Sequence, residues 1–316
     1  MRDNGNHLGQ LLESGEFRFA RLHLPDIDNE PVIRVNAPGI VEQETCLFHR
    51  SVAEGGEYLE LLHNFVERGM TERRPSPVVR FADGEYAFYK YTLGCNGLYR
   101  QAESVAAIRK AMPLHVDAFK KLASSGKIAP LIFPGNIDCG RKRTFLSLFR
   151  DSDEVSAVSF LDFLLGHGIS MTGERYIPFY AVYAYLTSEA FARLVDGRKL
   201  CILNAQCDPT ACCGWFVRFA SRPEIVFIEI PAEYVATRWE AMRDGILEQI
   251  PPDTDLCLAG AGVGALTVCV DVADRFALPV IDAGHVLNIM NGREDKSKGP
   301  RMYTLRKSRE RMAGAQ

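Results

Sequence analysis

The sequence predicts an α/β fold in which helices flank a mostly parallel sheet, built as a single large domain. Two observations predict it. Short apolar runs alternate along the 316-residue chain with segments whose apolar residues recur at helical spacing, an alternation that is typical of parallel sheets. Hydrophobic residues make up 47% of the chain and charged residues 24%, so a substantial core can be buried.

The predicted strands are short apolar runs that end at glycine, proline or polar residues. The first, "FRFARLHL", alternates between apolar and polar residues, as a strand with one buried face does. Later ones, such as "KLCILNA", are almost continuously apolar, which favours burial in a parallel sheet. In chain order, the predicted strands span residues 17–24, 78–82, 128–136, 199–205, 224–232, 255–262 and 278–285. Such an arrangement is Rossmann-like.

The predicted helices carry apolar residues along one side. Gly197 is expected to end the helix over 177–197, because glycine commonly follows the last helical turn. Pro113 is expected to break the helix over 99–127, because proline removes a backbone hydrogen bond. In chain order, the predicted helices span residues 55–70, 99–127, 156–168, 177–197, 236–250 and 265–277.

Charge and hydropathy exclude some classes of partner. The formal net charge of −3 does not indicate a nucleic-acid or membrane-surface partner. No apolar run approaches the roughly 18 residues of a transmembrane helix. The first residues, "MRDNGNHLGQLLESGEF", lack an apolar signal core, so we expect a cytoplasmic protein.

Nine cysteines are scattered along the chain, and none stands in C-x-x-C spacing. The cluster "CDPTACC" over residues 207–213 does not have the spacing of a zinc site. Unpaired cysteine behaves as a small hydrophobe, so the favoured interpretation is buried thiols that stay reduced in the cytoplasm.

The stretch "RFADGE" ends an apolar strand with two acids, Asp83 and Glu85. In extended chain these side chains point the same way, just past the carboxyl edge of the sheet, where ligands bind. Mg²⁺ or Mn²⁺, held by one or two carboxylates and ligand phosphates, would relieve their repulsion. On the tripeptide "DGE" alone, without its surroundings, an ordinary acidic turn is the favoured interpretation. Arg80 precedes the acids and is expected either to contact phosphate or to pair with Asp83.

A second candidate site follows the predicted strand over 255–262. Gly260, Gly262 and Gly264 precede a helix, where backbone amides and the helix dipole favour a phosphate. Asp282 follows Gly260 by 22 residues, much as the ribose-binding acid does in a dinucleotide fingerprint. A tight turn that merely needs glycine explains the same pattern equally well. His285, in "DAGH", is expected to bind a metal, bind a phosphate or accept a proton.

Together, "RFADGE" (80–85) and "IDAGH" (281–285) resemble the GT-D-type glycosyltransferase family, in their order and their separation. The resemblance spans roughly residues 46–292. It implies a nucleotide-activated sugar donor and a divalent metal, usually manganese. It also implies that Asp83 and Glu85 hold the metal against the donor diphosphate, with Asp282 and His285 at the same pocket. Ala82 replaces the family's usual glycine, and the turn "GAGVGALT" differs from the usual G-P-T-A-like sequence.

The resemblance divides the chain into an N-terminal extension over residues 1–45, a catalytic α/β domain over residues 46–292, and a tail over residues 293–316. The tail has eight Lys and Arg residues against three Asp and Glu residues. We interpret it as a solvated terminus; the alternative is a basic flap near an anionic ligand.

Other polar residues are candidates for the same chemistry. Arg141 and Arg143 in "GRKR" follow a predicted strand and could face the diphosphate, although a solvated charge run is the favoured interpretation. The general base for an acceptor hydroxyl is expected among His285, Asp282 and Glu174.

The acid pair, together with the resemblance to the GT-D-type family, implies a metal-dependent glycosyltransferase that uses Mn²⁺ or Mg²⁺. The donor is a nucleotide-diphosphate sugar, and the acceptor is a hydroxyl of a glycan, a protein or a small molecule. Two alternatives remain. One is an NAD(P)-type oxidoreductase that uses the "GAGVGA" turn; the other is a non-catalytic nucleotide-binding protein of the same fold.

Overall fold

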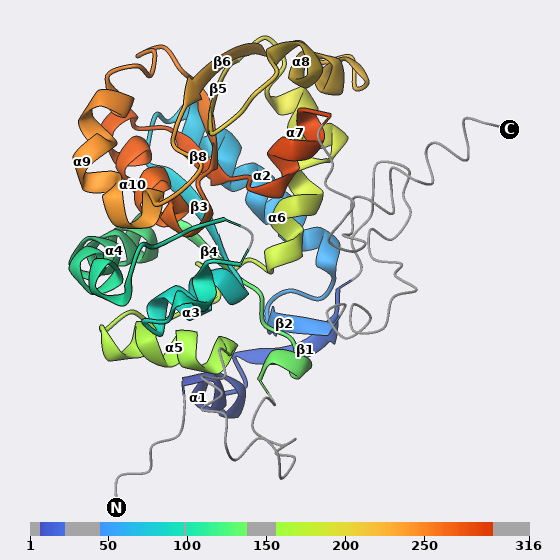
Figure 1. The fold of residues 1–316 in the computed structure, drawn as a ribbon. Helices are drawn as coiled ribbons and strands as arrows, with labels where there is room; N and C mark the ends of the chain where they lie inside the picture. The colour runs from blue at the N-terminus through green and yellow to red at the C-terminus, as the bar shows by residue number, and fades with distance from the viewer. Residues whose placement is uncertain (1–6, 23–44, 98, 138–155, 293–316) are drawn as a thin grey trace, which may run out of the picture.

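The computed structural model describes residues 7–22, 45–97, 99–137 and 156–292. These residues form one six-stranded sheet with helices on both faces, and a two-stranded antiparallel sheet beside it (Figure 1). All strands of the large sheet are parallel, in the order β4-β3-β8-β7-β5-β6. The predicted α/β fold class is therefore confirmed.

Among the described residues, every strand except β2 overlaps a strand predicted from an apolar run. The large sheet consists of β3 (Ser76–Phe81), β4 (Lys127–Pro130), β5 (Lys199–Asn204), β6 (Glu224–Glu229), β7 (Leu256–Gly260) and β8 (Pro279–Asp282). The small sheet pairs β1 (Phe17–Arg21) with β2 (Thr45–His49). All residues of β3 and β8 are buried, because these strands lie inside the sheet under helices on both faces.

Two groups of helices cover the large sheet (Figure 1). One face packs against α4 (Val105–Ser125) and α10 (Ala265–Phe276), beside which lies α9 (Val235–Leu247). The other face packs against α2 (Gly55–Thr71) and α6 (Phe179–Leu186), with α7 (Glu189–Leu194) next to both. The remaining helices are α1 (His7–Glu13), α3 (Asp83–Tyr89), α5 (Ala157–Gly166), α8 (Pro209–Val217) and α11 (His285–Met290).

Two predicted helix boundaries are wrong. Helix α4 continues through Pro113, because Met112 and Phe119 on either side bury the same apolar face and outweigh one lost backbone bond. The predicted helix over 177–197 is two helices. They separate at Ser188, whose hydroxyl accepts a hydrogen bond from the Phe191 backbone N–H at 3.1 Å and caps α7.

Short helices follow two of the strands closely. Helix α3 begins at Asp83, with one residue between it and the end of β3, and α11 begins at His285, with two residues between it and the end of β8. The Tyr86 hydroxyl lies 2.8 Å from the carbonyl oxygen of Leu131 and 3.1 Å from that of Phe81, which fixes α3 against the edge of the sheet. The polar residues that follow these strands therefore start helices.

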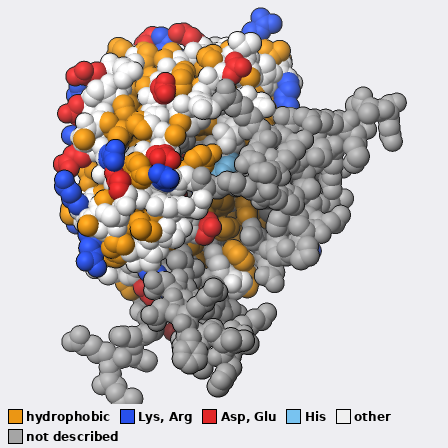
Figure 2. Space-filling view, in the orientation of Figure 1, with side chains coloured by type: hydrophobic (Ala, Val, Ile, Leu, Met, Phe, Trp, Pro, Cys, Tyr) orange, Lys and Arg blue, Asp and Glu red, His pale blue; other side chains and the backbone are white. Residues whose placement is uncertain are grey.

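The face of the molecule in Figure 2 carries Lys, Arg, Asp and Glu side chains interspersed, without a large field of one sign. In the part of the chain that the structure describes, no helix has both the length and the apolar character needed to cross a membrane. The tail over residues 293–316 lies outside the described residues, as does most of the predicted N-terminal extension.

Candidate active site

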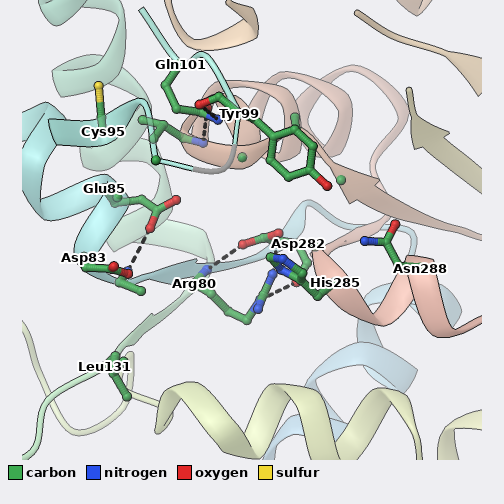
Figure 3. A pocket seen from close by; sticks show the side chains of 18 of the residues that line it. Arg80, Asp83, Glu85, Cys95, Tyr99, Gln101, Leu131, Asp282, His285 and Asn288 are labelled. Carbon is green, nitrogen blue, oxygen red and sulfur yellow. Dashed lines mark hydrogen bonds and ion pairs between the residues drawn. The ribbon is translucent and has the colours of Figure 1, made fainter. Parts of the chain in front are cut away.

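A pocket of about 770 Å³ lies at the carboxyl edge of the large sheet (Figure 3). It is lined by Asp83 and Glu85 after β3, and by Asp282 and His285 at the end of β8. These four residues come from the two motifs that the sequence places about 200 residues apart. They meet because β3 and β8 are adjacent parallel strands, whose carboxyl ends lie side by side.

The acid pair adopts a different local structure from the one predicted. Asp83 and Glu85 lie in the first turn of α3 and not in extended chain, so they do not point the same way. A Glu85 carboxylate oxygen accepts a hydrogen bond from the Ala82 backbone N–H at 2.9 Å, which starts the helix. A glutamate at the third helical position commonly marks the start of a helix, and here it precedes the apolar run "YAFY".

Glu85 and Asp83 differ in environment. Burial raises the pKa of Glu85 to about 7, and the hydrogen bond from Ala82 only partly opposes that shift. Asp83 is exposed at the pocket, at the end of α3 where backbone amides favour negative charge. The site thus holds a carboxyl group whose ionisation would be favoured by a nearby cation.

Arg80 pairs with Asp282 and not with Asp83. Its Nη2 lies 2.9 Å from Asp282 Oδ1, and its Nε donates to the Asp282 carbonyl oxygen at 2.8 Å. Its guanidinium also lies 5.1 Å from the ring centre of Phe179 and 4.4 Å from that of Tyr183. Burial lowers the pKa of Arg80, but the Asp282 carboxylate and the Tyr183 hydroxyl together outweigh this and raise the pKa overall. Arg80 therefore stays charged, and its charge is paired with Asp282 of the same chain.

Gly284 lets this ion pair form. Its φ of +44° lies in the region that favours glycine, and a Cβ there would lie 2.1 Å from Arg80 Nη2. The glycine in "DAGH" is thus explained by the arginine of "RFADGE", a link between the two motifs that spacing alone does not reveal.

The glycine turn packs against the protein itself. Gly260 and Gly262 line the pocket, whereas Gly264 is not among its lining residues. The Gln101 side-chain oxygen accepts a hydrogen bond from the Val263 backbone N–H at 2.9 Å. At Gly262, with φ of +54°, a Cβ would lie 2.5 Å from that oxygen. Close packing with Gln101 therefore accounts for a glycine in this turn without a phosphate.

The other predicted site residues lie apart from these groups. Glu174 is on an exposed loop and is not among the residues that line the pocket; its carboxylate lies 3.9 Å from Arg175 Nη2. Arg141 and Arg143 lie outside the described residues.

Several residues that line the pocket are not among those predicted from the sequence. Asn204 is the last residue of β5 and Gln206 follows the strand, with the same change from apolar to polar residues that marks Asp83. Asn288 is three residues after His285 on α11, which places both on one side of that helix and in the pocket. Aromatic side chains also line it: Tyr99, Phe179, Tyr180 and Tyr183. The strand-end pattern could have revealed Asn204, whereas the aromatic residues follow no local pattern.

The pocket suits a metal only together with a ligand. Within the described ranges, no group of three His, Cys, Asp or Glu side chains is placed to hold a metal ion. Mg²⁺ and Mn²⁺, however, are commonly bound by one or two carboxylates together with substrate phosphates. The exposed Asp83 and the half-buried Glu85, with its raised pKa, fit that incomplete set of oxygen ligands.

No family model matches the chain, and no curated protein matches it. Two solved structures are similar to it. One, described as a selenomethionine-substituted structure of domain of unknown function 1792, has 17% identity and a TM-score of 0.42. The other, described as showing that the same domain has a distinct glycosyltransferase fold, has 16% identity and a TM-score of 0.44. Each match covers 73% of this chain and 83% of the other.

Proposed function

We propose that the protein is a metal-dependent glycosyltransferase that uses a nucleotide-diphosphate sugar and an acceptor hydroxyl. One observation carries this proposal: the motifs "RFADGE" and "IDAGH" meet in a single pocket at the carboxyl edge of a parallel sheet. That edge is where nucleotide ligands bind in such folds. The volume of about 770 Å³ is also within the usual range for a site that encloses a small ligand.

The charges in the pocket support a role for a metal. Arg80 is the only Lys or Arg among the described residues that line it, and Asp282 already neutralises Arg80. A leaving nucleoside diphosphate needs positive charge to stabilise it. Asp83 and Glu85 would hold Mn²⁺ or Mg²⁺, which supplies that charge when bound. Arg141 and Arg143 are proposed as a further source.

His285 is the proposed general base. It lines the pocket at the start of α11, whereas the Asp282 carboxylate is buried and accepts hydrogen bonds from Arg80. Glu174 stays a weaker candidate because it lies outside the pocket. The aromatic side chains Tyr99 and Tyr180 would pack against the faces of the sugar or base.

The geometry favours a glycosyltransferase over an NAD(P)-type oxidoreductase. In a dinucleotide site, the acid after the second strand binds a ribose hydroxyl and the turn amides bind pyrophosphate. Here Asp282 pairs with Arg80, and the Val263 amide is bound by Gln101. A non-catalytic protein would keep the same pocket but show no turnover.

The test combines ligand binding with turnover. Melting temperatures are measured with a panel of nucleotide-diphosphate sugars and with NADH, each with and without Mn²⁺, because a ligand that binds only the native state raises the melting temperature. Release of nucleoside diphosphate is then measured for the donors that bind. We expect Mn²⁺-dependent binding of a nucleotide sugar, and Mn²⁺-dependent release.

Two variants make the assay specific. Asp83→Asn is expected to abolish release at an unchanged melting temperature without ligand. The matched control, Glu174→Gln, changes an exposed carboxylate outside the pocket and is expected to keep full release. Full activity in excess chelator would disprove the metal requirement, and stabilisation by NADH alone would favour the oxidoreductase.

A further inference from the structure

Cys207 and Cys212 lie in contact beside the pocket. Their sulfur atoms are 3.7 Å apart. Cys212 is fully buried in the first turns of α8, and Cys207 is half-buried in the segment that enters this helix. Four residues separate them, so a bond between the sulfurs would close only a small loop and requires a short movement.

Polar contacts fix this pair in place. The Asn291 side-chain oxygen accepts hydrogen bonds from the Cys212 thiol, with Sγ at 3.3 Å, and from the Asp208 backbone N–H at 2.7 Å. The Asp208 carboxylate in turn caps α8, accepting from the Thr210 backbone N–H at 3.0 Å. The two sulfurs are therefore held together by a helix cap and by a residue at the end of α11.

The cluster lacks the ligands of a zinc site. Cys213, the third cysteine of "CDPTACC", is exposed, and the described residues contain no group of three side chains that could hold a metal. A tetrahedral zinc site normally needs four ligands. What the geometry provides is one close pair of thiols.

We propose that Cys207 and Cys212 are a modification site, a dithiol that reacts with small-molecule disulfides of the glutathione type to form an internal disulfide. The Cys207 thiolate attacks one sulfur of the small disulfide, forming a mixed disulfide and releasing one small thiolate. Cys212 then attacks the Cys207 sulfur and releases the second. The protein loses two electrons, the small disulfide gains them, and the two thiol protons pass to the released thiolates.

The surroundings of the two thiols indicate which of them reacts first. The pKa of Cys212 is raised, chiefly by its hydrogen bond with Cys207 and then by burial, so Cys212 is a poor first nucleophile. Cys207 is more accessible than Cys212, so its thiolate makes the first attack on the small disulfide. Cys212 then completes the exchange at close range.

Oxidation of Cys207 and Cys212 would also change hydrogen bonds next to the pocket. Gln206, next to Cys207, lines the pocket, and its carbonyl oxygen accepts a hydrogen bond from Asn291 Nδ2 at 3.2 Å. Asn291 directly follows α11, which carries His285 and Asn288. A disulfide has no thiol proton, so the bond from Cys212 to Asn291 is lost on oxidation.

The test uses the full chain, reduced and then incubated with oxidised glutathione. Remaining thiols are alkylated after denaturation, and peptide mass spectrometry identifies each bond. We expect a Cys207–Cys212 disulfide without retained glutathione. Cys212→Ser is expected to stop at a glutathione mixed disulfide on Cys207. Cys213→Ser, the matched control, is expected to form the internal disulfide as the wild type does.

Two results would overturn the proposal. One is alkylation of both Cys207 and Cys212 in the wild type while glutathione collects on Cys213. The other is equal trapping of glutathione on Cys207 in the wild type and in Cys212→Ser, which would mean that Cys212 does not complete the exchange. Circular dichroism of each variant before oxidation checks that the fold is retained.

Discussion

Replacing Asp282 by asparagine removes the charge that compensates the buried Arg80 guanidinium. The side chains of this pair are each only 7% exposed, and 2.9 Å separates Arg80 Nη2 from Asp282 Oδ1. Removing one partner of a buried ion pair costs about 3–5 kcal/mol of the free energy of unfolding, because the other charge is left uncompensated. Phe179 and Tyr183 still contact the guanidinium, so we expect about 3 kcal/mol.

The assay is urea-induced unfolding followed by circular dichroism. The matched control is Asp274→Asn, which removes the same charge from a surface pair with Lys121 whose side chains are 36% and 52% exposed. Such a pair contributes at most about 1 kcal/mol. The comparison separates loss of a buried partner from loss of a carboxylate as such.

A double-mutant cycle tests the reasoning further. In Arg80→Met with Asp282→Asn, neither side chain carries a charge, so the combined loss is expected to fall short of the sum of the single losses by about 2 kcal/mol or more. Equal losses for Asp282→Asn and Asp274→Asn would refute the reasoning, and so would additive losses in the cycle.

Three further predictions concern stability and are checked by the same unfolding measurement. Gly284→Ala is expected to cost more than about 2 kcal/mol, because of the positive φ and the contact with Arg80, whereas Gly245→Ala in α9, where a Cβ meets nothing within 4 Å, should raise stability by up to about 1 kcal/mol. Ser188→Ala removes the cap of α7 and is expected to cost about 1 kcal/mol; no loss would contradict the cap. Burial lowers the pKa of His115 from 6.5 to about 4, so between these values the unfolded state binds the proton first and stability falls as the pH falls, by about 3 kcal/mol in all. A His115→Gln variant with the same pH profile as the wild type would rule out His115 as the cause.

The placement of both motifs at one edge of the sheet could be predicted from the sequence for a physical reason. Runs such as "VVRF" and "PVID" are apolar enough to be strands of a parallel sheet, and parallel strands present their carboxyl ends at one edge. Polar residues that follow such runs therefore lie at one edge, as Asp83 and Asp282 do. The pattern does not say which strands are neighbours, so it indicates a shared edge and not a shared pocket.

The interactions inside the site could not be predicted in the same way. Arg80 is bonded to Asp282 across 202 positions of sequence, and nothing near Arg80 distinguishes this partner from Asp83. The helical start at Asp83 depends on the Glu85 cap, which competes with continued extended chain. The break at Ser188 likewise depends on one hydroxyl group within a segment that is helical on both sides. Each outcome is decided by a single hydrogen-bonded group and not by a repeated pattern.

The position of β8 has a consequence for how the protein reaches its native state. This strand is the last in the described chain, yet it lies between β3 and β7 and is the only strand that joins the β4-β3 pair to the β7-β5-β6 group. During synthesis on the ribosome, the two parts of the sheet cannot unite until residues 279–282 have emerged. Contacts between residues so distant in sequence form slowly. The pocket thus requires β8 to be paired on both sides, so a chain that stops short of β8 would expose two unpaired strand edges and would lack Asp282 and His285.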